Sequence, residues 1–88
     1  MKVAVYAICK NEARFAARWM ASMGEADGVY VLDTGSTDGT AERLRALGAV
    51  VAVEWSENCA ELLARESPIV IDIQRTGEND RRINVTGL

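Results

Sequence analysis

The sequence predicts an α/β fold with a mainly parallel β-sheet of about four strands, connected through βαβ units. Short apolar runs rich in valine and isoleucine recur along the chain, which is typical of strands covered on both faces. Segments with apolar residues at helical spacing lie between these runs. Strands that alternate with helices of this length form right-handed crossovers, and these give a parallel sheet.

The first half of the chain contains two strands and two helices of this pattern. Residues 3–9 are predicted as the first buried strand, and Asn11 is predicted to cap the helix that follows. Residues 29–32 are predicted as the second strand and residues 37–47 as the second helix, with a stop at Gly48. The first helix is identified by its apolar positions, which are Phe15, Trp19, Met20 and Met23.

The second half repeats the pattern more weakly. Residues 49–53 are predicted as a third strand, residues 58–65 as a shorter helix, and residues 69–73 as a fourth strand. Residues 75–88 are polar and charged, so either a flexible tail or an edge hairpin turning at residues 77–80 is consistent with them. We favour the tail.

Length and composition exclude several functional classes. The 88 residues suffice for one domain with a modest core, and 49% hydrophobic with 26% charged residues is ordinary for a soluble globular protein. A net charge of −3 gives no reason to expect nucleic acid or an anionic membrane as partner. No apolar run reaches the roughly 18 residues of a transmembrane helix, and we interpret the opening residues as a strand, not a signal peptide.

The chain contains no histidine, which excludes Ser-His and Cys-His catalysis and removes the commonest metal ligand. Its two cysteines, Cys9 and Cys59, stand apart without metal-ligand spacing. We expect them to be buried, reduced thiols of a cytoplasmic protein.

One turn suggests a binding site. The second strand ends on Asp33, and small polar residues and glycines follow it in the stretch VYVLDTGSTDGTAERL. Ligands of open parallel sheets bind beyond the carboxyl ends of the strands, so we expect Asp33 to face a crevice there. Its carboxylate could accept a hydrogen bond from a base, a ribose hydroxyl or a metal-bound water. The alternative is a well-capped turn, with Ser36 or Thr37 capping the next helix and Asp38 at its positive end.

The end of the first strand reads ICKNE, and ICKNE followed by VLDTGSTDGT resembles the start of the family-2 glycosyltransferases. These enzymes have the GT-A fold and transfer a sugar from a nucleotide-diphosphate donor. The resemblance covers residues 2–53 and consists of two linked motifs in the right order. It implies that the chain is the Rossmann-like half of a GT-A fold.

The resemblance also implies site residues. Lys10, Asn11 and Glu12 would line the donor pocket near the uridine or other base, while Asp33 and Thr34 would contact the base and ribose. The matching Ser36 and Asp38 are assigned to helix capping. Trp55, just past the third strand, could stack on a base or sugar, or could cover the edge of the core.

The resemblance weakens after the third strand. The family usually has an Arg-Asn pair there, then a strand ending in Asp-x-Asp whose carboxylates hold a divalent metal, Mn or Mg. Here Glu57 replaces the arginine, Asp72 is the candidate metal ligand, and Gln74 stands where the second carboxylate belongs. A neutral amide is a poor ligand for a hard cation. Asp72 as a solvent-facing residue at a strand end is the alternative.

The family continues into an acceptor-binding half that carries the catalytic base, for which 88 residues leave no room. We therefore expect residues 1–74 to be a truncated half-domain that recognises a nucleotide-diphosphate sugar, with a UDP-sugar as the leading candidate, and the isolated chain to be inactive. The alternative is a small α/β scaffold or protein-interaction module. A half-sheet leaves apolar surface or a strand edge open, which favours a homo-oligomer or a partner subunit.

Overall fold

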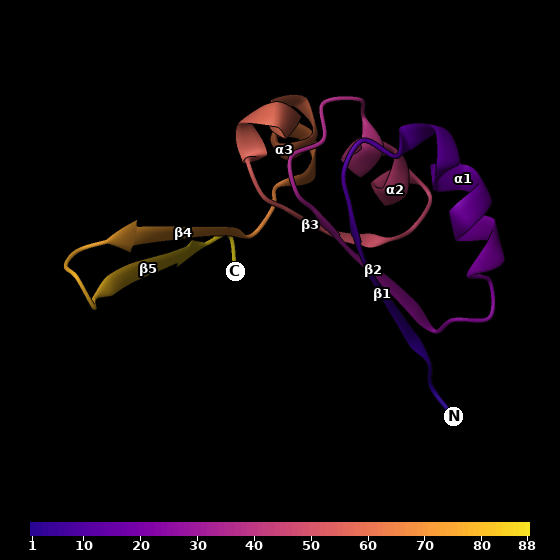
Figure 1. Cartoon of the computed structure of the whole chain (residues 1–88), viewed down its shortest axis with the longest axis horizontal. Helices are drawn as coiled ribbons and strands as arrows, with labels where there is room; N and C mark the ends of the chain where they lie inside the picture. Colours follow the sequence, from indigo (N-terminus) through magenta and orange to yellow (C-terminus); the bar gives the residue numbers. More distant parts are fainter.

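The computed structural model describes all residues, 1–88, and contains two separate sheets (Figure 1). The larger is a three-stranded parallel sheet in the order β1-β2-β3, and the smaller is a hairpin of β4 and β5. The strands are β1 (Ala4–Cys9), β2 (Gly28–Asp33), β3 (Val50–Val53), β4 (Val70–Arg75) and β5 (Arg81–Thr86). The helices are α1 (Ala13–Ser22), α2 (Thr40–Ala46), the 3-10 helix η1 (Ser56–Cys59) and α3 (Ala60–Glu66).

The parallel sheet confirms the predicted α/β class and the adjacency of the first two strands. β1 and β2 pair in register from Ala4 with Gly28 to Cys9 with Asp33, and β3 continues from Tyr30 with Val50 to Asp33 with Val53. The carboxyl ends of all three strands therefore lie along one edge of the sheet, which we call the carboxyl edge.

The core is small and lies on one side of the sheet. Both α1 and α2 pack on the same face, where Val31 of β2 meets Ala16 and Leu44 (Figure 1). A second cluster joins Ala41 of α2 to Cys59 and Leu62. Only 11 of the 88 residues are buried, so the expectation of strands covered on both faces is wrong. The reason is that no helix lies on the second face of the sheet.

The helices begin later than the sequence pattern indicates. Asn11 does not cap α1, because it lies in the left-handed region with φ of 54°, and α1 begins two residues later at Ala13. The second helix begins at Thr40 instead of residue 37, after Gly39 with φ of 86°. Asparagine and glycine adopt this backbone conformation at low cost, so both loops turn sharply before their helices start.

The predicted fourth strand forms, but it does not join the parallel sheet. β4 pairs only with β5, in an antiparallel hairpin that projects from the body of the molecule (Figure 1). The prediction of a mainly parallel four-stranded sheet is therefore wrong. So is the preference for a flexible tail, because residues 81–86 form a strand. Ile83 and Val85 in this polar segment stand opposite Ile73 and Ile71, and these apolar cross-strand pairs favour the hairpin.

None of the helices is long and apolar enough to cross a membrane.

Candidate functional site

The turn after β2 is organised by Asp33, whose side chain is 0% exposed. One carboxylate oxygen, Oδ1, accepts hydrogen bonds from the backbone N–H of Gly35 (2.9 Å) and of Ser36 (2.8 Å). Gly35 has φ of 118°, a conformation that suits glycine and brings these two N–H groups back to the carboxylate. The expectation that Asp33 faces an open crevice is wrong: the carboxylate is used within its own turn.

Cys9 lies beside this carboxylate at the end of β1. Burial, together with the negative charges of Asp33, Glu12 and Asp38, raises the pKa of the Cys9 thiol to about 11. The thiol is therefore protonated near neutral pH, and its Sγ points its weak S–H donor at Oδ2 of Asp33 over 4.0 Å. Cys9 and the buried Cys59 are both free thiols, and burial also raises the pKa of Cys59. Neither has the lowered pKa of a reactive cysteine.

Side chains of the β2–α2 turn satisfy the backbone at the start of α1. Asn11 N–H donates to Ser36 Oγ (2.8 Å), Glu12 N–H to Thr40 Oγ1 (2.9 Å) and Ala13 N–H to Asp38 Oδ2 (3.2 Å). The bonding is reciprocal, because Asn11 Oδ1 accepts from the backbone N–H of Thr37 (2.8 Å). The first free N–H groups of α1 are thus capped by the neighbouring loop, which explains why α1 has no cap of its own.

Asp38 has the capping role that the sequence suggested, but it serves two helices. Its Oδ1 accepts from the Thr40 backbone N–H at 3.0 Å and from the Thr40 hydroxyl, while Oδ2 accepts from Ala13 at the start of α1. The hydroxyl bond from Thr40, with the backbone bonds, holds the pKa of this carboxyl below its usual value. The carboxylate is therefore charged at neutral pH and locks the two loops together.

The structure brings four of the predicted site residues to the carboxyl edge. Lys10, Asn11 and Glu12 are exposed directly after β1, and Thr34 lies half-buried beside them. Thr34 is fixed by its backbone N–H and its hydroxyl, which both donate to the Cys9 carbonyl at 3.0 and 3.1 Å. This edge therefore presents a cation, an amide and a hydroxyl on a rigid backbone.

Trp55 completes the edge on the far side of β2. It follows β3, its side chain is 66% exposed, and its backbone is left-handed with φ of 58°. Its Cδ1 would lie 3.2 Å from a Cβ placed on Gly35, so the indole stands directly against the turn. The reading in which Trp55 covers the core edge is wrong. Left-handed backbone at a bulky residue is costly, and here it holds an aromatic ring in solvent beside Gly35.

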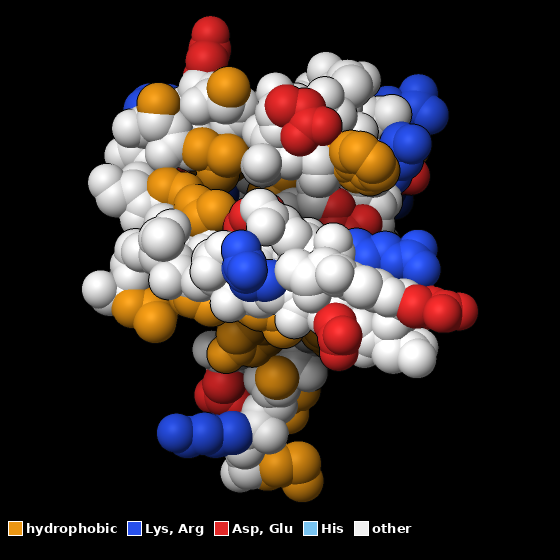
Figure 2. All heavy atoms as spheres, turned by 90° about the vertical axis from the view of Figure 1, so that its left-hand side faces the viewer, with side chains coloured by type: hydrophobic (Ala, Val, Ile, Leu, Met, Phe, Trp, Pro, Cys, Tyr) orange, Lys and Arg blue, Asp and Glu red, His pale blue; other side chains and the backbone are white.

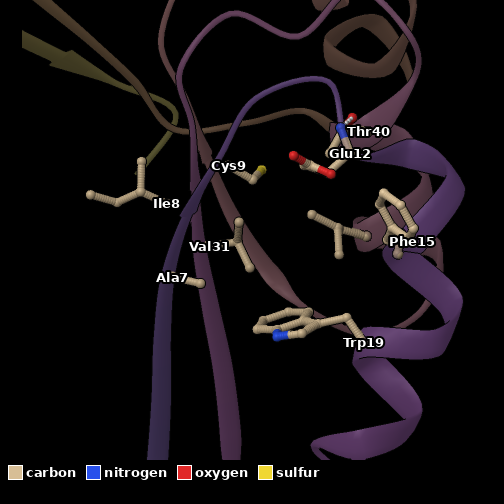
Figure 3. Close-up of a pocket in the computed structure, with 10 residues that line it drawn as sticks. Ala7, Ile8, Cys9, Glu12, Phe15, Trp19, Val31 and Thr40 are labelled. Atoms are coloured by element: carbon tan, nitrogen blue, oxygen red, sulfur yellow. Dashed lines mark hydrogen bonds between the residues drawn. The ribbon is translucent and has the colours of Figure 1, made fainter.

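A second feature, which the sequence did not reveal, is a cavity of about 320 Å³ between β1 and α1 (Figure 3). Its walls are mostly apolar and include Phe15 and Trp19, while Glu12 and Thr40 stand at one end. The small side chains of Ala7 and Ala16 leave this space between strand and helix. The small residues Ala7 in the predicted strand and Ala16 in the predicted helix were the sequence signal that could have indicated a space between the two elements.

The metal ligands implied by the family resemblance are not brought together. Asp72 lies exposed on β4, in the projecting hairpin, and its Oδ2 accepts from Gln74 Nε2 at 3.0 Å. No group of three or more acidic, cysteine or histidine side chains in the structure could hold a metal ion. Asp72 with the neutral amide of Gln74 does not fit a divalent metal, which prefers carboxylate oxygens.

Comparison of the chain with protein-family models, with curated proteins and with solved structures found no match.

Proposed function

We propose that this chain is a glycosyltransferase-like domain that recognises a nucleotide-diphosphate sugar at the carboxyl edge and does not transfer the sugar by itself. The observation that supports this most is the exposed indole of Trp55 against Gly35, across β2 from Lys10. A flat aromatic surface and a cation on either side of a rigid polar turn match the base and the phosphates of a nucleotide. The motifs ICKNE and DTGSTDGT lie at this same edge.

The proposal assigns each group a role. The base stacks on Trp55, the Thr34 hydroxyl and the free amide NH2 of Asn11 bond the base or ribose, and the Lys10 ammonium faces the phosphates. Asp33 acts as a positioning residue, because its Oδ1 already accepts two backbone hydrogen bonds and its side chain has no exposed surface. UDP-sugars are the leading ligands by the sequence resemblance, and the protein would work in the cytoplasm with its thiols reduced.

Transfer is not expected from the chain alone. A glycosyl transfer needs a base that removes a proton from the acceptor hydroxyl and a group that stabilises the departing diphosphate. Glu12 and Asp38 place negative charge near the end of β1, so Lys10 offsets only part of the charge that builds up on a departing diphosphate. Recognition without catalysis is therefore the function that the geometry supports best.

Calorimetric titration of UDP and of UDP-glucose into the purified chain tests this proposal. Trp55→Ala should weaken binding by about 1 to 3 kcal/mol, the usual value of one base–aromatic stack, or roughly 5-fold to 150-fold. Trp55→Phe is the matched control, since it keeps a stacking ring and should retain most of the affinity. Added manganese should change little, because Asp72 is bonded to Gln74 in the hairpin.

A scaffold or interaction module is the second candidate, and a specific observation favours it. The polar side chains of the turn, Asp33, Ser36, Asp38 and Thr40, are all engaged in hydrogen bonds within the chain. They would have these roles in a protein without any ligand. No UDP binding at millimolar concentration by the folded wild-type chain would overturn the nucleotide proposal and leave this candidate.

A further inference from the structure

The parallel sheet has one uncovered face, which we call the open face. Side chains alternate along each strand, and those that point away from α1 and α2 are apolar and largely exposed, with Tyr6 at 75% and Ile8 at 64%. Ile8 is seen in Figure 3 on the opposite side of β1 from Trp19. The open face contains no charged residue and consists of Ala4, Tyr6, Ile8, Tyr30, Leu32, Val50 and Ala52.

The β4–β5 hairpin has an apolar face of its own. Ile71 stands opposite Val85, and Ile73 stands opposite Ile83, so these four side chains share one side of the hairpin. All four are exposed. The other side is mostly polar, with Asp72 opposite Asn84 and Gln74 opposite Arg82. An isolated two-stranded hairpin is marginally stable in water and needs cover for its apolar side.

These two apolar surfaces do not cover each other within one chain. The hairpin forms a separate sheet and stands away from the body (Figure 1). Figure 2 views the molecule from the side on which the hairpin projects, and hydrophobic side chains gather there below the hairpin. One molecule thus exposes two separate apolar surfaces, the apolar side of the β4–β5 hairpin and the open face of the parallel sheet.

The chain exposes more surface than a compact protein of its size. A compact protein of 9.6 kDa is expected to expose about 5,100 Å², whereas this chain exposes 6690 Å². The radius of gyration is 14.6 Å, against about 12 Å for a compact chain of this length. The excess is roughly 1,600 Å² per chain. Two chains that each buried this area would share about 3,200 Å², which is the range of obligate homodimers.

We propose that two copies of the chain form a two-fold symmetric dimer by exchange of their hairpins. The apolar face of each β4–β5 hairpin packs on the open face of the other copy. The open face has no charged side chain. Arg75 and Arg81 lie on the apolar side of the hairpin but at its turn end, where both side chains donate to the Gly77 carbonyl, so the contact can keep them at its solvent-exposed rim. Two-fold symmetry uses both surfaces of both copies and leaves none free for further growth. This inference does not rest on the nucleotide proposal.

Sedimentation equilibrium of the full chain tests the dimer. The wild type should sediment at twice its 9.6 kDa mass at micromolar concentration. Ile8→Lys, on the open face, and Ile83→Lys, on the hairpin, should each weaken the dimer by more than about 100-fold, because each buries unpaired charges in both contacts. Asn84→Lys is the matched control: it is adjacent to Ile83 but on the polar side of the hairpin, and it should remain dimeric.

Mixing the two monomeric variants tests the exchange itself. In a mixed dimer, the Ile8→Lys chain contributes an unaltered hairpin and the Ile83→Lys chain contributes an unaltered open face. One of the two contacts is therefore fully native. An equimolar mixture should therefore contain heterodimer at concentrations where each variant alone is monomeric. Circular dichroism verifies folding, and Val50→Lys or Val85→Lys replaces a variant that does not fold.

Three results would overturn the proposal. A wild-type monomer at 100 μM, on the order of the weakest expected affinity, would show that no such dimer forms. If only Ile8→Lys weakened the dimer, the two open faces would pack on each other. If only Ile83→Lys weakened it, the two hairpins would pack on each other. In either of these two cases the exchange is wrong.

Discussion

The carboxyl edge and the β4–β5 hairpin distribute polar and apolar groups in opposite ways. At the carboxyl edge, the Asp33 carboxylate is fully buried and accepts hydrogen bonds from the backbone N–H groups of Gly35 and Ser36, two and three residues later in the chain. In the hairpin, isoleucines such as Ile71 and Ile83 are mostly exposed. The polar groups of the carboxyl edge find their hydrogen-bond partners within the chain, whereas the apolar side of the hairpin has no surface of the same chain to cover it. Stability measurements should therefore respond strongly to the polar residues of the edge, and association to the apolar residues of the hairpin.

The largest effect on stability is expected from Asp33→Ala. It removes the acceptor of two buried backbone N–H groups, which should lower the free energy of unfolding by about 3 kcal/mol in urea denaturation. Asp27 offers the matched control, because its carboxylate also accepts a backbone hydrogen bond, from Val3, but it is exposed to water. Asp27→Ala should cost about 1 kcal/mol or less. Equal effects of the two substitutions would contradict the structural role of Asp33.

The next effect concerns alkaline pH. The pKa of Cys9 is raised from 9.0 to about 11, so the folded state favours the neutral thiol. The corresponding stability is fully present below pH 9 and is lost as the pH rises toward 11, because the unfolded chain releases this proton first. The loss should reach up to about 2 kcal/mol after allowance for partial exposure of the thiol. Cys9→Ala should flatten the stability profile between pH 9 and 11, and an unchanged profile would argue against this cause.

A smaller effect is expected from Ser36→Ala. Its hydroxyl accepts from the Asn11 backbone N–H at 2.8 Å and ties the two loops of the carboxyl edge. The loss of this bond should lower the free energy of unfolding by about 1 kcal/mol. The neighbouring Thr37→Ala is the control, because the Thr37 side chain is exposed and makes no hydrogen bond. If the two variants unfold at the same urea concentration, the loop-to-loop bond contributes nothing measurable.

The sequence predicted the parallel sheet because its signals are local. The apolar runs of β1 to β3, and the glycines between them, determine strand, turn and helix within a few residues. The position of β4 was missed for the opposite reason: the partner of a strand is chosen by distant residues, and Ile83 and Val85 lie in a segment whose overall composition is polar.

The positions of some candidate site residues could be predicted for the same physical reason. The residues that reach the carboxyl edge, Lys10 to Glu12 and Thr34, follow directly from where the strands end. The burial of Asp33 was missed because residue type alone does not show that the next two N–H groups turn back to its carboxylate. The sequence Asp-Thr-Gly-Ser, with glycine two positions after aspartate, was the available signal for that turn. The exposure of Trp55 beside Gly35 had no local signal in the sequence.

Titration of UDP into the isotope-labelled chain, followed by NMR, tests the central claim most directly. Saturable shifts are predicted for the amides of Lys10, Asn11 and Gly35 and for the indole N–H of Trp55. The amides of the hairpin, Ile71 to Val85, should not move. Shifts confined to the cavity between β1 and α1, or no shifts at millimolar UDP in a folded sample, would contradict a nucleotide site at the carboxyl edge.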